Sequence, residues 1–487
     1  MSHKIVGTSR VLSGADAAFL NLERKEIPLN IACVAIFDGP IPFEDFVAKI
    51  DSKLHMVPRY RQVVVPPPYN LGYPTWEWDP HFDIRRHVLR ARLDPPGGEA
   101  ELSALAGRIL SQVMDRRKPL WEIYVVEGLQ DGRGALIPRV HHALADGISG
   151  AALLNLILDP TVEASRVITK RRYRVPRQAR KETSVSDALA NAARSTAENI
   201  LAAEAVLMSL VQGLLTPRMQ ESLQGLVGLL PELAASQERL PFNNPCTGQR
   251  QFCWTDFSLA DVQAIREAAG GTINDVVVTV MTRALAHYVR LHGQDVDHRF
   301  VRMVCPFSLR RNDKGESLGN QISFLPVALP LDIEDPVKML HAVAARLRIM
   351  KGARVADLLA LAGAWLGSAP PPLQALFWQG LPLIPLPLPL LNMICTNVPG
   401  SPVPLYSMGR RLLASYPQVP TGHELGVGCA VQTYDGGIFF GIISDTDAAP
   451  DADRLRDFIQ LSFSELCRAA GVKRTAPRRN VPIVPAA

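Results

Sequence analysis

The cysteines of this sequence lack the pairing that marks a disulfide framework or a zinc ribbon. All seven are scattered over 487 residues, their number is odd, and none belongs to a C-x-x-C pair. The opening residues also lack a continuous apolar run followed by a small-residue cleavage site, so we expect no signal peptide. We therefore expect a protein that stays in the reducing cytoplasm.

Strong net charge is absent as well. The formal net charge is only +5, which does not predict nucleic-acid binding. With 47% hydrophobic and 20% charged residues, the chain is typical of globular proteins and not of disordered ones. Its length exceeds what one hydrophobic core usually holds, so we expect more than one domain.

One long stretch contains no charge at all. Residues 358–409 are 52 residues without Asp, Glu, Lys, Arg or His, and their ten prolines leave no 18-residue helical run for a membrane span. Two interpretations remain open, a buried apolar wall and an exposed patch that touches lipid. We favour the buried wall. Either interpretation suits a long apolar substrate.

The order of apolar runs and helical patterns predicts an α/β fold. Residues 31–37, 121–129 and 134–140 read as strands, with Pro138 placing the last at an edge or an irregular position, and 101–117 has helical spacing. The same alternation restarts near residue 250. We predict two α/β halves, with the boundaries 1–160 for the N-terminal half, 161–249 for a basic linker and crossover helices, 250–472 for the C-terminal half and 473–487 for a basic, proline-containing tail.

The predicted linker begins with a basic segment. Residues 160–183 contain eight Lys or Arg and two acidic residues, without apolar periodicity. We favour a solvated segment over a docking patch for anionic lipid or coenzyme. An amphipathic helix follows over 184–215, with Ser186 or Asp187 as its cap.

Two histidines stand where the third predicted strand ends. His141 and His142 are followed by Asp146 and Gly147 in "RVHHALADGISG". His142 and Asp146 could ligate a metal, but no third ligand lies nearby, so we expect no metal site. A serine nucleophile is not supported, because the G-x-S-x-G elbow is missing. A histidine general base remains, since imidazole titrates near neutral pH. The alternative is a histidine pair that only ends a strand.

The motif H-H-x-x-x-D-G, together with other segments, resembles a known family. It is the signature of CoA-dependent acyltransferases with the chloramphenicol acetyltransferase fold, and the chain resembles their bacterial wax ester synthase/diacylglycerol acyltransferase branch. The resemblance extends almost end to end. It rests on six further pieces in the expected order: 12–23, 76–88, 114–129, 272–278, 305–310 with 318–324, and 396–412.

The resemblance implies a fold and roles for particular residues. The fold would be two chloramphenicol acetyltransferase-like halves joined by a helical crossover, with a channel between them. His142 would be the general base, His141 secondary, Asp146 orienting and Gly147 the turn. Other predicted site residues are Asn274 and Asp275 in the second half, which also fit a helix N-cap, and Pro119, Leu120 and Trp121 in the wall between the halves.

The resemblance also implies an activity. An acyl group would pass from acyl-CoA, a co-substrate, to a diacylglycerol or a fatty alcohol, without an acyl-enzyme and without a bound cofactor. The neutral product implies peripheral contact with a membrane or lipid inclusions. Two alternatives stay open: transfer to a polyketide or glycolipid hydroxyl, and a non-catalytic coat protein of lipid inclusions. The oligomeric state is not predicted.

Overall fold

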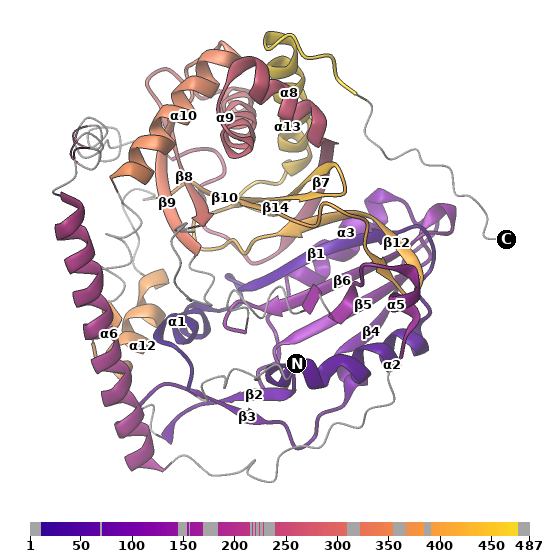
Figure 1. Cartoon of the computed structure of the whole chain (residues 1–487), viewed down its shortest axis with the longest axis vertical. Coiled ribbons are helices and arrows are strands. Elements are labelled where there is room, and N and C mark those ends of the chain that lie inside the picture. The colour runs from indigo at the N-terminus through magenta and orange to yellow at the C-terminus, as the bar shows by residue number, and fades with distance from the viewer. Residues whose placement is uncertain are drawn as a thin grey trace.

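The architecture comes from a computed structural model of the whole chain (Figure 1). It describes residues 11–68, 71–144, 153–154, 156–168, 184–214, 217, 220, 224, 227, 239–308, 322–353, 366–367, 369–383 and 391–475, and within 184–214 and near 306–325 only some of the side chains. In these ranges the strands form two six-stranded sheets and a two-stranded hairpin. The predicted α/β class with two halves is confirmed.

The first sheet contains the strand that carries the histidines. Its order is β11-β12-β1-β6-β5-β4. The bounds are Tyr406–Ser407, Arg410–Gln418, Asn30–Phe37, Gly134–His141, Trp121–Glu127 and Val88–Arg92, in that order. The hairpin pairs β2 (Gln62–Val65) with β3 (Thr75–Trp78). Two strands of this sheet, β11 and β12, come from the predicted C-terminal half, an exchange that the sequence pattern did not predict. The segment boundaries themselves stay a prediction.

The second sheet belongs to the C-terminal part of the chain. Its order is β7-β14-β13-β10-β8-β9, with the bounds Arg250–Ser258, Gly437–Asp445, Val427–Tyr434, Met393–Val398, Phe300–Ser308 and Ile322–Pro330. Each sheet anchors one hydrophobic core. The core of the first sheet also contains Phe252, Trp254 and Phe439 from the second sheet, so the two halves share packed side chains.

Helices cover both sheets. In Figure 1, α8, α9, α10 and α13 lie over the outer side of the second sheet, and α6 runs along one edge of the molecule. Their bounds and those of the other helices are α1 Gly14–Leu22, α2 Phe43–Lys53, α3 Glu99–Leu110, α5 Val162–Arg166, α6 Val185–Leu214, α8 Leu259–Ala269, α9 Ile273–Leu291, α10 Pro336–Gly352, α12 Pro371–Gly380 and α13 Ala452–Ala469.

Of the two positions expected for the strand of Pro138, an edge or an irregular position, the structure shows the irregular one. β6 lies inside the sheet, between β1 and β5. Its pairing with β5 is continuous, but the residue pairs with β1 stop at Ala32–Arg139 and resume at Ala35–Leu136. The interruption lies opposite Pro138, which has no N–H to donate. A short gap in one ladder therefore admits proline to an interior strand.

The predicted linker is partly helical. α5 is capped by Thr161, whose hydroxyl accepts from the Ala164 N–H at 3.2 Å, and residues 169–183 lie outside the described part of the chain. The predicted long helix is present as α6. Its cap is Ser184, not Ser186 or Asp187, because the Ser184 hydroxyl accepts from the Asp187 N–H at 3.1 Å.

A buried ion pair of the C-terminal half also contacts the N-terminal half, through a hydrogen bond from Arg250. The Arg250 guanidinium pairs with the Asp445 carboxylate and also donates to the carbonyls of Glu26 at 3.1 Å and Thr421 at 2.8 Å. Nearby, Gly441 of β14 lies so close to β12 that an added Cβ would be 1.8 Å from the Pro417 carbonyl oxygen. The two sheets therefore meet backbone to backbone at this point.

The uncharged stretch is divided between interior and surface. Met393 and Cys395 of β10 are buried, whereas Leu373, Leu376 and Phe377 of α12 are exposed. The expectation that this stretch is buried is thus confirmed for part of β10 and is wrong for the outer face of α12. Among the described helices, none is long and apolar enough to cross a membrane.

Candidate active site

The two histidines sit where a buried strand ends. All eight residues of β6 are buried, and the strand stops at His141. Backbone hydrogen bonds then fix both residues: the His141 N–H donates to the Leu120 carbonyl at 3.0 Å, and the His142 N–H donates to the Leu29 carbonyl at 2.8 Å. A buried strand held on both sides is a rigid support for a reactive side chain.

The neighbours of His141 define its tautomer. Its Nδ1 accepts a hydrogen bond from the Ala143 N–H at 3.0 Å, which leaves the ring proton on Nε2. That Nε2 lies 3.2 Å from the Glu23 carboxylate, close enough for a charge contact but without the alignment of a full hydrogen bond. His141 is fully buried. It therefore links the histidine turn to the end of α1.

Glu23 is the carboxylate that the sequence analysis did not assign. Its side chain is fully buried, and Arg116 donates to it at 3.1 Å and to the Leu20 carbonyl at 2.6 Å. Burial alone would raise the pKa of the Glu23 carboxyl, but the contacts with His141 and Arg116 outweigh it and lower the pKa. Glu23 is thus an anion at neutral pH and holds His141 in place.

His142 has a different environment. Its ring stacks on Phe19 of α1, with centroids 3.8 Å apart and planes 21° apart. Burial lowers the pKa of His142 to about 4, although a hydrogen bond with the residue's own backbone carbonyl opposes the effect. The ring is therefore neutral over the physiological pH range and has a nitrogen able to accept a proton.

The Pro-Leu-Trp segment lies directly against this turn. Pro119, Leu120 and Trp121 are all buried, and the Leu120 carbonyl is the partner of the His141 N–H. The Trp121 indole donates to the Tyr60 carbonyl at 2.7 Å and stacks on His87 with centroids 4.6 Å apart. The segment thus positions the backbone of the histidine turn.

Asn274 and Asp275 occupy the first turn of α9. Asp275 forms a capping box with Thr272: the Thr272 N–H donates to the Asp275 carboxylate at 2.8 Å, and the Asp275 N–H donates to the Thr272 hydroxyl at 3.2 Å. Asn274 is half-buried beside it. In the described part of the chain, neither residue bonds to either histidine. The N-cap interpretation therefore explains Asp275.

Asp146 and Gly147 lie outside the described residues. Their predicted roles stay predictions. Within the described ranges, no group of three or more His, Cys, Asp or Glu side chains is placed to hold a metal ion.

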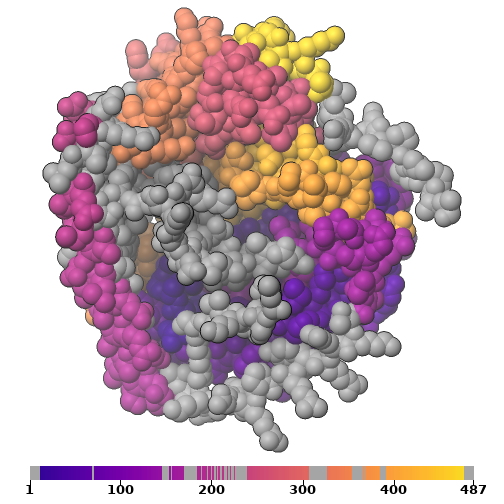
Figure 2. Space-filling view, viewed as in Figure 1, coloured from indigo at the N-terminus to yellow at the C-terminus, as the bar shows by residue number. Residues whose placement is uncertain are grey.

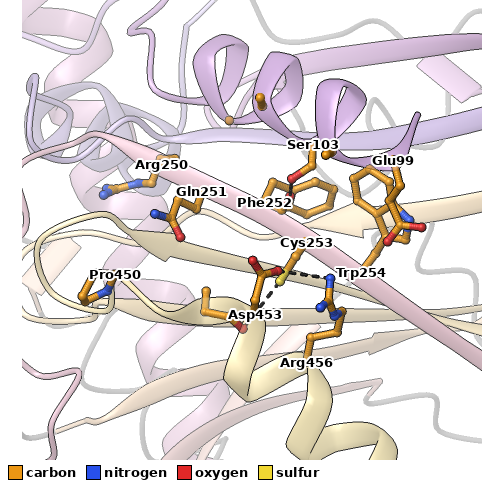
Figure 3. Close-up of a pocket in the computed structure, with 14 residues that line it drawn as sticks. Glu99, Ser103, Arg250, Gln251, Phe252, Cys253, Trp254, Pro450, Asp453 and Arg456 are labelled. Carbon is orange, nitrogen blue, oxygen red and sulfur yellow. Dashed lines mark hydrogen bonds and ion pairs between the residues drawn. The ribbon is translucent and has the colours of Figure 1, made fainter. Parts of the chain in front are cut away.

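A separate pocket lies at the junction of the halves (Figure 3). It has a volume of about 550 Å³ and is lined by α3, β7 and the start of α13. Ser103 donates to the Phe252 carbonyl at its wall, and Arg456 pairs with Asp453 at 3.1 Å. None of the predicted site residues lines it, so it is distinct from the histidine turn.

Sequence reasoning missed three residues around the histidines. Glu23 and Phe19 stand inside the segment 12–23 that carried part of the family resemblance, and that membership was the available signal. Asn30 lies directly opposite His141 in the β1–β6 register, and its amide donates to the Gln112 carbonyl at 2.9 Å. Nothing in the local sequence marks Asn30.

Comparisons with known proteins show the family of the whole chain. Residues 12–277 match the wax ester synthase/diacylglycerol acyltransferase catalytic domain, and residues 318–467 match the WS/DGAT C-terminal domain. The chain is 29% identical over 474 residues to a probable diacylglycerol O-acyltransferase, tgs1, of Mycobacterium tuberculosis, covering 96% of this chain and 98% of that one.

Two solved structures share the fold. The wax ester synthase/diacylglycerol acyltransferase from Marinobacter aquaeolei VT8 superposes with a TM-score of 0.63 at 24% identity, covering 95% of this chain and 100% of that one. A mutant starter condensation domain of rhizomide synthetase, in complex with C8-CoA, gives a TM-score of 0.50 at 14% identity, with 97% of each chain covered. The chain therefore belongs to the wax ester synthase/diacylglycerol acyltransferase family and is an acyltransferase.

Proposed function

We propose that this acyltransferase moves a fatty acyl group from acyl-CoA to the hydroxyl of a diacylglycerol or a long-chain alcohol. The products are triacylglycerol and wax ester. The observation that carries the proposal is His142, a neutral imidazole held at the end of a buried strand and stacked on Phe19. A neutral ring in an apolar surrounding suits proton abstraction from an alcohol.

The reaction proceeds by direct transfer in this proposal. His142 takes the proton from the acceptor hydroxyl as its oxygen attacks the thioester carbonyl carbon. The tetrahedral intermediate collapses, the carbon–sulfur bond breaks, and the CoA sulfur leaves with the proton from His142. His141, Glu23 and Arg116 are positioning residues, because they touch the histidine turn and not the reacting atoms.

Burial of the thiols supports a mechanism without an acyl-enzyme. All seven cysteines are buried, and burial is the main cause that raises the pKa of Cys33 to about 11 and of Cys253 to about 12. Buried, protonated thiols are poor nucleophiles. Incubation with palmitoyl-CoA alone should therefore leave the protein mass unchanged, whereas an added palmitoyl mass would contradict direct transfer.

The family and the fold support the proposed substrates. A condensation domain of this fold binds C8-CoA, which makes acyl-CoA the favoured donor. The uncharged residues 358–409 suit a long apolar acceptor. We also propose peripheral association with a membrane or a lipid inclusion, because the acceptor and the product reside there.

An acceptor panel tests this proposal. Purified protein is incubated with palmitoyl-CoA and either hexadecanol, dioleoylglycerol or a polar polyketide alcohol. The ester products are then separated and quantified by mass spectrometry. We expect hexadecyl palmitate or triacylglycerol and little polyketide ester. Exclusive acylation of the polyketide alcohol would contradict the proposed acceptor class. The alternative interpretation of the basic segment, a docking patch for coenzyme, is tested separately by reversing the charges of Arg171, Arg172 and Arg174: a raised acyl-CoA KM would support it, and an unchanged KM would refute it.

A further inference from the structure

Helix α12 buries a polar residue and exposes apolar ones. Its buried residues are Pro371 and Gln374, whereas Leu373, Leu376 and Phe377 are 59%, 67% and 43% exposed. Soluble helices normally bury their leucines and expose their glutamines. An exposed apolar face over a buried polar residue indicates that the outer face meets an apolar partner.

Polar contacts fix α12 in this orientation. The Gln374 amide donates to the Tyr73 hydroxyl and to the Ala369 carbonyl, each at 2.6 Å. At the other end of the helix, the Gln379 amide donates to the Asn21 side chain at 3.0 Å. Turning the apolar face inward would break these hydrogen bonds, which therefore stabilise the observed orientation of the helix. The exposure of the apolar face of α12 is therefore fixed by specific hydrogen bonds and does not result from loose packing.

The position of α12 connects its face to the histidine turn. α12 packs against α1, and both lie on the same side of the molecule in Figure 1. α1 carries Phe19, which stacks on His142. An apolar phase on the outer face of α12 is thus connected to the proposed base through two packed helices, α12 and α1.

Charge around α12 indicates the chemistry of the partner. The helix itself contains no charged residue, and Leu383 just beyond it is 73% exposed. Cations outnumber the acid at the rim: Arg24 donates to the Gln379 carbonyl at 2.7 Å, the neighbouring Lys25 is exposed, and the exposed Glu26 is the acidic residue beside them. An apolar face with a cationic rim fits the surface of an anionic phospholipid layer, in which apolar side chains enter the acyl region and cations meet the head groups.

We propose that α12, with Leu383, is the surface by which this protein docks on an anionic lipid layer, and that docking delivers the apolar acceptor toward His142. The proposal rests on the function proposed above for the acceptor, and it adds the surface and its partner. α6 also exposes apolar side chains, among them Leu201 and Met208, along one edge of the molecule (Figure 2). The proposal does not depend on them.

The test compares the double variant Leu376→Asp/Phe377→Asp with Leu461→Asp. Leu461 lies on α13 and is exposed to the same 43% as Phe377, so it is a matched control on another surface. Each protein is floated with vesicles of phosphatidylcholine and phosphatidylglycerol that contain dioleoylglycerol. We expect the double variant to lose at least roughly tenfold in vesicle affinity, because two apolar side chains no longer insert. The control should float like the wild type.

Activity separates this proposal from the proposed function. With palmitoyl-CoA, the double variant should lose activity on dioleoylglycerol in vesicles and keep it, within about threefold, on octanol dissolved in water. If the wild type acylates neither acceptor, the proposed function fails, and flotation still decides the docking surface. The milder pair Leu373→Gln/Leu376→Gln replaces the double variant if the latter melts at a lower temperature.

Three results would overturn the docking proposal. The first is flotation of the double variant with wild-type affinity. The second is an equal loss of flotation in the Leu461→Asp control. The third is a wild type that does not float and elutes as a dimer that the double variant converts to a monomer, since a second copy of the chain would then cover α12.

Discussion

The contact between Glu23 and His141 gives the sharpest prediction for a residue outside the histidine motif. Glu23→Gln keeps the shape of the side chain and removes its charge. The fully buried carboxylate contacts Arg116, which is 43% exposed and so partly solvated, and lies 3.2 Å from His141. The loss should therefore be smaller than for a fully buried ion pair, about 1–2 kcal/mol in the free energy of unfolding.

Activity should respond more strongly than stability. His141 and His142 share one turn, so a shift of the first ring moves the second, and a displacement of the base lowers kcat by about tenfold to a hundredfold while KM stays close to that of the wild type. Urea unfolding measures the stability, and CoA release with palmitoyl-CoA and hexadecanol measures kcat and KM.

Glu122→Gln is the matched control. Glu122 is also a buried carboxylate, paired with Arg139 at 2.6 Å, but its side chain makes no described contact with either histidine. It should lose stability to a similar or greater extent with kcat changed less than about threefold. The reasoning is refuted if Glu23→Gln retains wild-type kcat, or if Glu122→Gln loses as much kcat as Glu23→Gln.

Three further predictions follow from burial and close packing. Because burial lowers the pKa of His142 to about 4, kcat/KM should fall only as the pH approaches 4; an acid limb centred near 6.5 would contradict this environment. Burial likewise lowers the pKa of His87 to about 4, so its stabilisation is complete above about pH 6.5 and is lost as the pH falls toward 4, on the order of 3 kcal/mol. In His87→Gln the urea concentration at the unfolding midpoint should therefore depend less on pH over this range. A pH dependence equal to that of the wild type would contradict this prediction. Gly441→Ala, whose Cβ would lie 1.8 Å from the Pro417 carbonyl oxygen, should cost more than about 2 kcal/mol in chemical unfolding, whereas Gly380→Ala, with open space around it, should be nearly neutral; equal effects would refute the close contact.

Local patterns predicted the parts of the fold that depend on nearby residues. The strands at 31–37 and 121–129 and the long helix near 184–215 all appear, with the helix cap misplaced by two or three residues. The exchange of β11 and β12 into the first sheet was not predictable, because strand partners far apart in sequence leave no local signal. For the same reason the sequence left two positions open for Pro138, an edge and an irregular one, because whether a missing N–H is tolerated depends on the neighbouring strand.

The site shows the same division. The adjacent histidines could be found because their spacing is itself the signal. Asn30 could not, and for Glu23 the only signal was its place in the segment 12–23, since only the folded chain brings these residues to His141. The apolar residues of α12 were expected to be buried and are exposed instead. The tertiary hydrogen bonds of Gln374 decide which face of this helix turns inward, and they leave no local signal in the sequence.

The central claim is that His142 is the general base, and one comparison tests it most directly. CoA release from palmitoyl-CoA is followed for the wild type and for His142→Ala, with hexadecanol and with dioleoylglycerol separately. We predict acceptor-dependent release in the wild type and a loss of at least roughly a hundredfold in kcat for the variant, with retained folding by circular dichroism. Release that depends on the acceptor and is unchanged in His142→Ala would contradict the account.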